Sequence, residues 1–392
     1  MRVLLVGDYP PDPRLGSSKV PFKLQEELRG LGHTCDVLFA DDLGATPRNP
    51  YLRQAFAPFV ALWAVRRTFR ERGRYDIIDV ASAEGLWIGV LHRLGAFPGT
   101  AVIARSNGLE HLNYRRMLDD HKEGLSYKPW TRRWFYPLVR LTQVAAAARA
   151  ADRLILLNET DRDFAIARGW KPADEIDIVP HGVSTVFLAD VPAREQARGR
   201  GILFCGSWTA MKGVSHLADA FSRLVDRGLR ANLTILGGAV PDETILSAFS
   251  IAARAQVTLV ARVAEAEVIA AYRTHDVFVL PSTYEGFGMV VLEAMTQRLP
   301  VIATPVGAAK GLIVSGQTGL LVPPRDPAAL AVAIERLMKD PELRMRLADA
   351  AFDRVRGMTW TATAIHTLDV YSRALDKNRR RAATGRRLER SV

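Results

Sequence analysis

The sequence predicts an α/β protein of two domains, each built on a doubly wound parallel sheet. The chain has 392 residues, and a domain usually takes about 100–200, so two domains are expected. Short β-branched runs bounded by Gly, Pro or Asp recur about every 25–45 residues, with helical periodicity between them. These runs are continuously apolar, which is typical of parallel strands buried on both faces. Two successive βαβ arrays are therefore expected.

Each half of the chain is expected to supply six strands. In the first half they are residues 3–6, 37–39, 77–80, 101–104, 154–157 and 178–179. In the second half they are residues 202–205, 233–236, 257–260, 277–280, 301–303 and 320–322. Because α/β folds bind ligands at the carboxyl ends of their strands, two such domains facing each other would form a central binding cleft.

The boundary between the domains is expected near residues 180–200, where turn residues and charges occur without sustained periodicity. This division gives an N-terminal domain at 1–182 and a C-terminal domain at 183–359. A helix at about 360–376 is expected to pack back on the first domain. The basic residues 377–392 are expected to form a disordered tail.

The composition describes a globular protein, with 48% hydrophobic and 24% charged residues. The longest apolar stretch, residues 55–65, contains Pro58 and is shorter than the roughly 18–20 residues that a spanning helix needs. The first residues resemble a strand rather than a secretory signal, so a cytoplasmic location is expected. The two cysteines, Cys35 and Cys205, lie in apolar runs and are expected to be buried.

The chain has a formal net charge of +11, concentrated in residues 377–392 and 114–150. Anionic lipid, nucleic acid or phosphorylated metabolites would suit these stretches, and so would a merely solvated surface. No recognition motif accompanies them, so a nucleic-acid partner is not expected. Residues 55–69 and 126–141 place Trp and Phe next to Arg, which suits either helices at a lipid interface or amphipathic core helices. A peripheral position at the inner face of the membrane is therefore left open.

The strongest chemical signal is the segment VFVLPSTYEGFGMVVLEAM, residues 277–295, in which a strand, a Gly-rich turn and a helix follow one another. Gly286 and Gly288 permit close approach of the backbone, and the helix start offers free N–H groups to a phosphate. Glu285 and Glu293 flank this turn and are separated by about 10–15 Å of turn and helix. One carboxylate would suit the ribose of a sugar nucleotide and the other its hexose. Alternatively, Glu285 caps the helix and Glu293 is solvated.

Together these features resemble the retaining glycosyltransferases of the GT-B fold, family four. The run EGFGMVVLE matches their E-x7-E motif, and further matching segments are GHTCDV, VPHGV, FCGSWTAMKG, THDVFVLPS, LPVIATPVG and SGQTGLLVPPRDPAAL. The resemblance covers nearly the whole chain and is more specific in the second domain. It implies two Rossmann-like domains and transfer of a sugar from a nucleotide-sugar donor, with retention of configuration, to a glycan, a lipid-linked glycan or a small molecule, as in polysaccharide biosynthesis.

The resemblance also implies roles for individual residues. Glu285 would contact the donor sugar and Lys212 would neutralise the diphosphate, which makes these two the expected catalytic residues. Glu293 would bind the ribose, the backbone of Val263 would contact the base, and Gly16 would face the phosphates from the first domain. The full expected donor site is Gly16, Ser207, Lys212, Val263, Glu285, Gly286, Phe287, Gly288, Met289 and Glu293.

The sequence departs from the family pattern at several positions of the donor site. Ser207 stands where the family usually has an arginine, so one phosphate-binding cation is missing, and Arg105 is one candidate to replace it. Ala308 and Gly311 stand where the family usually has a second glycine and a glutamate near the donor. These departures leave open a non-catalytic module that binds a sugar nucleotide or a glycan.

On the acceptor side, Asn107 stands where one branch of the family has a histidine. Asparagine cannot take a proton, so acid–base chemistry there would fall to His111 or to no residue.

No metal or cofactor is expected. Asp161 and Asp163 have D-x-D spacing but lie where a helix begins, and acidic residues are ordinary in a first turn. The histidines show no zinc-binding spacing.

Overall fold

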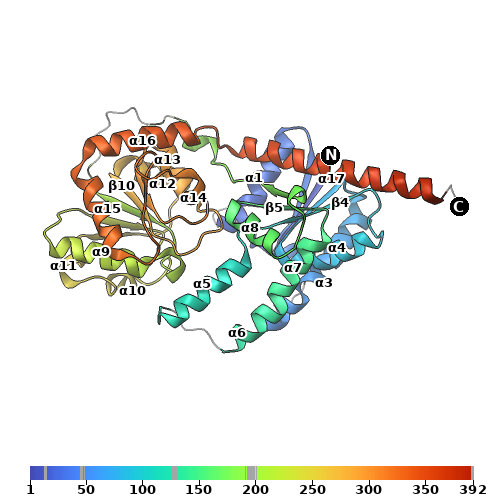
Figure 1. The fold of residues 1–392 in the computed structure, drawn as a ribbon, viewed down its shortest axis with the longest axis horizontal. Coiled ribbons are helices and arrows are strands. Elements are labelled where there is room, and N and C mark those ends of the chain that lie inside the picture. Colours follow the sequence, from blue (N-terminus) through green and yellow to red (C-terminus); the bar gives the residue numbers. More distant parts are fainter. Residues whose placement is uncertain are drawn as a thin grey trace. The chain divides into compact units, whose positions relative to one another are not determined.

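The computed structural model describes residues 1–12, 16–44, 47, 49–125, 130–189, 191, 199 and 201–389. The chain divides into two compact units, each with its own sheet and surrounding helices (Figure 1). Unit 1 comprises Met1–His111, Lys128–His181 and Trp360–Val392. Unit 2 comprises Leu112–Tyr127 and Gly182–Thr359.

The sheet of unit 1 has six parallel strands in the order β2-β1-β3-β4-β5-β6. The strands are β1 (Arg2–Val6), β2 (Thr34–Leu38), β3 (Ile77–Ala81), β4 (Ala101–Arg105), β5 (Arg153–Leu156) and β6 (Ile176–Ile178). Every residue of β3, β4 and β5 is buried, because helices cover both faces. The six strands predicted for this half are therefore confirmed, with ends shifted by up to three residues.

Most helices of unit 1 connect these strands. They are α1 (Gly16–Gly30), α2 (Ala40–Leu43), α3 (Pro50–Arg72), α4 (Leu86–Arg93), α6 (Trp130–Phe135), α7 (Thr142–Ala150), α8 (Glu159–Ala167) and α17 (Trp360–Glu389), together with a 3₁₀ turn at Ser82–Gly85 and a π-helical segment at Tyr136–Leu141. α3 begins where the Asn49 side chain accepts hydrogen bonds from the N–H groups of Tyr51 and Leu52, and Pro50 fits the first helical position.

The sheet of unit 2 also has six parallel strands, in the order β12-β11-β10-β7-β8-β9. The strands are β7 (Ile202–Cys205), β8 (Leu233–Leu236), β9 (Val257–Val260), β10 (Val277–Leu280), β11 (Val301–Ala303) and β12 (Leu320–Leu321). The first five have the bounds that the sequence predicts. Continuous apolar runs thus located strands reliably here, because the four central strands β7, β8, β10 and β11 are buried on both faces.

The helices of unit 2 are α9 (Val214–Asp226), α10 (Asp242–Leu246), α11 (Ile251–Arg254), α12 (Glu265–Thr274), α13 (Met289–Thr296), α14 (Ala309–Leu312), α15 (Pro327–Lys339) and α16 (Pro341–Val355). α15 and α16 each begin with an aspartate cap followed by proline. Asp326 accepts from the N–H of Ala329, and Asp340 accepts from the N–H of Leu343. Such caps satisfy helix N–H groups that have no partner within the helix.

α17 runs beside α1 and β4 in unit 1 (Figure 1). Tyr371 is fully buried, and its hydroxyl donates to Asp79 at 2.6 Å. The helix extends to Glu389, whereas the sequence predicts a disordered tail from residue 377. The tail is rich in Ala, Arg and Leu, which favour helix, and its start is anchored where Asn378 donates to Asp152 at 3.0 Å.

The helix α5 (Glu110–Lys122) also departs from the predicted division at residue 182. From Leu112 onward its residues belong to unit 2. Arg325 donates to Asp120 at 2.8 Å and pairs with Glu123 at 3.0 Å. The sequence could not indicate these long-range ion pairs.

Cys35 and Cys205 are buried free thiols, as predicted. No helix among the described residues is long and apolar enough to span a membrane.

Candidate functional site

The Gly-rich turn between β10 and α13 is held in a tight conformation. Gly288, the residue before α13, has φ +86°, a left-handed conformation that favours glycine. Gly307 has φ +54°, and a Cβ atom there would lie 2.6 Å from the carbonyl oxygen of Phe287. The N–H of Ala308 donates to that same oxygen at 2.6 Å. The loop after β11 therefore supports the turn through its backbone.

Glu285 and Lys212 form an ion pair within this site. The Nζ atom of Lys212 lies 2.6 Å from Oε1 of Glu285, and both side chains are largely buried. The hydroxyl of Ser282, which is fully buried, donates to the same oxygen at 2.6 Å. Two donors thus fix the orientation of the Glu285 carboxylate. Glu285 does not cap α13, because the residue at the cap position is Gly288.

The position of Lys212 depends on the docking of two loops. Lys212 ends a 3₁₀ turn, Ala210–Lys212, and is followed by Gly213 with φ +67°. A Cβ atom at Gly213 would overlap the carbonyl oxygen of Pro281. The N–H of Thr283 donates to the carbonyl of Met211 at 2.8 Å. The loop after β7 is therefore locked against the turn after β10.

Glu293 is buried, not solvated, with 8% of its surface exposed. The hydroxyl of Tyr272 donates to its Oε2 atom at 3.2 Å. Burial, together with the nearby Glu293 carboxylate, raises the pKa of Cys205 to about 12. Burial also raises the pKa of Tyr272 well above its ordinary value. Both neighbours of Glu293 therefore stay protonated at neutral pH.

The other expected donor residues of unit 2 lie at the same edge of the sheet. Ser207 follows β7, and Val263 follows β9 in the loop before α12. Because the strands are parallel, their carboxyl ends meet at one edge, together with the turn that contains Gly286, Phe287 and Met289. Fold and local geometry thus bring nine of the ten expected donor residues to one edge of unit 2.

The tenth expected donor residue, Gly16, belongs to unit 1. It is exposed and forms the first residue of α1. The preceding PRL residues, 13–15, lie outside the described part of the chain.

The departures at Ala308 and Gly311 have different structural consequences. Ala308 is buried and contributes its N–H to the turn, so its side chain is not needed for that contact. Gly311 lies in α14, and a Cβ atom there would meet no heavy atom within 4 Å. A Cβ atom at Gly311 would therefore fit without displacing its surroundings.

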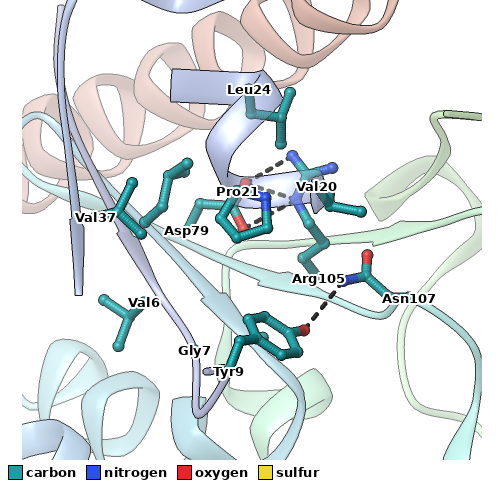
Figure 2. Close-up of a pocket in the computed structure, with 12 residues that line it drawn as sticks. Val6, Gly7, Tyr9, Val20, Pro21, Leu24, Val37, Asp79, Arg105 and Asn107 are labelled. Atoms are coloured by element: carbon teal, nitrogen blue, oxygen red, sulfur yellow. Dashed lines mark hydrogen bonds and ion pairs between the residues drawn. The ribbon is translucent and has the colours of Figure 1, made fainter. Parts of the chain in front are cut away.

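On the acceptor side, the amide of Asn107 donates to the hydroxyl of Tyr9 at 3.0 Å (Figure 2). Both residues line pockets at the carboxyl ends of the unit 1 strands. The ring of His111 packs instead against Trp170 and Phe164, with centroids 4.8 and 5.7 Å away. The structure therefore gives His111 a packing role and places Asn107 in the pocket.

Arg105 does not supply the missing cation of the donor site. Its guanidinium makes a bidentate ion pair with Asp79, with a closest distance of 2.7 Å, and 5% of the residue is exposed (Figure 2). Its charge is already balanced by Asp79 within the core of unit 1. Asp161 and Asp163 lie in the first turns of α8, as predicted, and Asn158 caps that helix.

Sequence reasoning missed several residues of the two sites. Ser282 holds Glu285, and Tyr272 holds Glu293. Ser282 ends the family-matching segment THDVFVLPS, but the resemblance gave it no role, and Tyr272 lies outside the matching segments. Their roles follow only from contacts made in the folded chain. An observable signal did exist for Ser282, which precedes Glu285 by one turn's length in the PSTYE segment.

Comparison with known proteins now identifies the family. Residues 193–354 match the model of glycosyl transferases group 1, and residues 16–187 match that of glycosyltransferase family 4. The chain belongs to glycosyltransferase family 4. Its curated relatives include a D-inositol 3-phosphate glycosyltransferase from Kineococcus radiotolerans, 33% identical over 61% of each chain. Another is an alpha-D-kanosaminyltransferase from Streptomyces kanamyceticus, 34% identical over 52% of this chain and 56% of that protein.

Several solved structures share the fold. Sucrose-phosphate synthase from Thermosynechococcus elongatus superposes with a TM-score of 0.76 at 21% identity, covering 96% of this chain and 99% of that one. HepE from Anabaena, solved with UDP and glucose, gives a TM-score of 0.68 at 16% identity, covering 95% and 99%. The GT-B fold is therefore established. The alignments with the curated relatives span about three fifths of their length or less.

Proposed function

We propose that this protein is a retaining glycosyltransferase that moves a sugar from a nucleotide-sugar donor to a hydroxyl group of an acceptor. The observation that carries the proposal is the placement of Glu285 and Glu293, both buried and each held by a hydrogen bond, on either side of the N-terminus of α13. The names of the relatives, all transferases, favour turnover over a non-catalytic binding module.

The donor diphosphate would lie at the N-terminus of α13, where free N–H groups and the helix dipole favour an anion. Lys212 would add a full positive charge as the leaving group departs. The bond between the sugar C1 and the diphosphate oxygen breaks, and the acceptor oxygen forms the new bond to C1. The proton of the acceptor hydroxyl passes to the leaving phosphate oxygen. Glu293 would bind the ribose hydroxyls and Glu285 those of the sugar.

We further propose that this reaction needs no metal ion or cofactor, because Lys212 and the helix N-terminus are placed to provide the positive charge that the diphosphate requires. Transfer should then proceed at the same rate in excess EDTA. A rate that falls with EDTA and recovers with added Mg²⁺ or Mn²⁺ would contradict this.

The decisive experiment measures nucleotide binding and its dependence on Glu293. UDP, GDP and ADP are titrated by calorimetry into the protein, into Glu293→Ala and into Glu243→Ala, which alters an exposed glutamate on α10. One nucleotide should bind, and Glu293→Ala should weaken it about tenfold or more while the control does not. Transfer of sugar from the matching donor then tests catalysis. Nucleotide binding that is unchanged in Glu293→Ala would refute the assignment of Glu293 to the ribose.

We also propose that unit 1 rests on the inner face of the cytoplasmic membrane. Four side chains on one face of α3 are each about half exposed: Leu52, Phe56, Phe59 and Trp63. Arg66 and Arg70 are exposed on the same helix. Apolar side chains beside cations suit an anionic lipid surface.

Sedimentation with vesicles tests this placement. The protein should sediment with vesicles that contain phosphatidylglycerol and should not sediment with vesicles of pure phosphatidylcholine. Trp63→Ser should weaken binding, whereas Ile251→Ser, which changes a highly exposed isoleucine of unit 2, should not. Equal loss in both variants, or binding to neither vesicle, would argue against a specific membrane face. No nucleic-acid partner is proposed.

A further inference from the structure

A polar pocket in unit 1 contains Asn107, the residue expected on the acceptor side. It opens at the carboxyl ends of β1, β3 and β4, where α/β folds bind ligands. The side chains that matter for its chemistry are Tyr9, Ser82, Glu84, Asn107, Glu110 and Arg140. This set is called the polar pocket below.

Arg140 joins two carboxylates in this pocket. Its guanidinium donates to Glu84 at 2.8 and 3.3 Å and to Glu110 at 3.1 to 3.3 Å. Ser82 also donates to Glu110, at 2.6 Å. Burial opposes the Arg140 charge, but the two carboxylates outweigh it and raise the pKa of Arg140 above its ordinary value. Arg140 therefore remains charged, and its three nitrogens are all engaged.

The charges of the pocket do not balance. Among the described residues that line it, one guanidinium faces two carboxyl groups, which is a formal excess of one acidic group. Asp8, which also lines the pocket, is paired with Arg53 at 2.8 Å and adds no net charge. Burial raises the pKa of Glu84, which is 2% exposed, while Arg140 opposes that rise. A phosphate in this pocket would lie near Glu84 and Glu110, and Arg140 already pairs with both. In a partly desolvated site the repulsion between the phosphate and these carboxylates is strong.

Several features indicate that the pocket is built to hold a ligand. Arg140 is presented by the π-helical segment Tyr136–Leu141, and such segments are rare and often occur at functional sites. Ser82 has φ +52°, a conformation that costs energy in a non-glycine residue. The side-chain oxygen of Asn107 is buried and accepts no hydrogen bond from any described residue. The same side chain also lines the neighbouring pocket that Figure 2 shows.

We infer that the polar pocket holds the acceptor, and that this acceptor is an unphosphorylated polyhydroxy ring, preferably one that carries an amino group. Its hydroxyl groups would donate to the free oxygen of Asn107 and to the exposed edge of Glu110. An ammonium group would balance the remaining negative charge. The inference rests on the proposed glycosyl transfer, since it names the substrate class of that reaction. The inferred acceptor of this chain therefore differs from that of any relative that acts on a phosphorylated ring.

Three related probes test the charge preference. Binding of 2-deoxystreptamine, myo-inositol and myo-inositol 1-phosphate is measured by calorimetry on the full chain in the presence of the nucleotide that it binds. The aminocyclitol should bind about tenfold or more tighter than the phosphate. Glu110→Gln should reduce this ratio about tenfold, because it removes the unbalanced charge and keeps the shape of the side chain. Glu71→Gln, an exposed change on α3, should leave the ratio unaltered.

The outcomes separate the two proposals. Tighter binding of the phosphate, binding of none of the three probes, or an unchanged ratio in Glu110→Gln would overturn the inference about the acceptor. If nucleotide binding persists and still depends on Glu293 in the same samples, the proposed glycosyl transfer survives that result. Loss of nucleotide binding in the unaltered protein would instead refute the proposed function. Thermal unfolding of Glu110→Gln checks that the variant is folded.

Discussion

Lys212 and Glu285 lie 73 positions apart in the sequence, yet their charged atoms are 2.6 Å apart at the edge of the unit 2 sheet. The pair is largely buried, and Ser282 donates to the same carboxylate oxygen. A donor diphosphate that requires Lys212 must therefore compete with Glu285 for it. That competition would free the Glu285 carboxylate for the sugar as the diphosphate binds. Donor binding and the orientation of the Glu285 carboxylate would then be linked through one lysine.

Substitutions in this pair should separate binding from turnover. Lys212→Met should weaken nucleoside diphosphate binding about tenfold, since a charge-assisted contact is lost. Glu285→Gln should bind the nucleotide at least as tightly, because Lys212 is released, but should lower kcat about 100-fold. Calorimetry and initial rates measure the two effects. Lys339→Met, which alters an exposed lysine paired with Glu335, is the control. Parallel losses of binding in both pair variants would contradict the competition.

Glycine substitutions should show how much the loops after β7 and β11 contribute to stability by packing against the turn after β10. Gly213→Ala and Gly307→Ala should each lower the free energy of unfolding by about 1–3 kcal/mol, because both need positive φ and neither has room for a Cβ atom. Gly311→Ala, in open space within α14, should be neutral or slightly stabilising. Urea denaturation of the three variants measures the difference. Equal free energies of unfolding in the three variants would mean that the contacts of Gly213 and Gly307 contribute little to stability.

The strands and the Gly-rich turn could be predicted because their signals are local. Apolar runs such as Val277–Leu280 occupy strands buried on both faces, so composition alone locates them. The E-x7-E spacing placed Glu285 and Glu293 on either side of a helix start, as the structure has them. In both cases the relevant residues are close in sequence, and helix geometry fixes their separation.

The partners of these residues could not be predicted because they come from distant segments. Glu84 and Arg140 are 56 positions apart, and only the fold brings them into contact. Arg105 was expected to be available to a phosphate, but Asp79 from the neighbouring strand β3 already holds it. An isolated charged residue in a sequence does not reveal whether its charge is already balanced.

The arginine that the family usually has at position 207 offers a gain-of-function test. Ser207→Arg should tighten nucleoside diphosphate binding several-fold, because Ser207 lies at the same sheet edge as Lys212 and a second cation would approach the phosphates. The gain should shrink as salt is raised. Ser207→Gln provides a long uncharged control. No gain in Ser207→Arg, or the same gain in both variants, would show that charge at this position does not limit binding.

The final prediction concerns Asp161, a buried carboxyl at the start of α8. Burial raises its pKa to about 7, although the N–H of Leu109 and the side chain of Asn158 favour the charged form. In the unfolded chain its pKa is about 3.9. The folded state therefore holds more protons between these values, and the stability that the protonated group contributes is present below pH 4 and lost as pH rises through 7. Asp161→Asn keeps the shape of the protonated side chain but cannot ionise.

Relative to the unaltered protein, Asp161→Asn should be more stable by about 1–2 kcal/mol at pH 5, where the carboxyl of the unfolded chain is already ionised, and by about 4 kcal/mol at pH 8, where the folded chain is ionised as well. Denaturant unfolding at the two pH values gives the comparison. Other titrating groups, such as His181, whose pKa burial lowers to about 3, are present in both proteins and cancel in the difference. Asp163→Asn changes an exposed aspartate on the same helix and should show no such pH dependence. A constant difference between the proteins at pH 5 and pH 8 would mean that Asp161 does not titrate in this range.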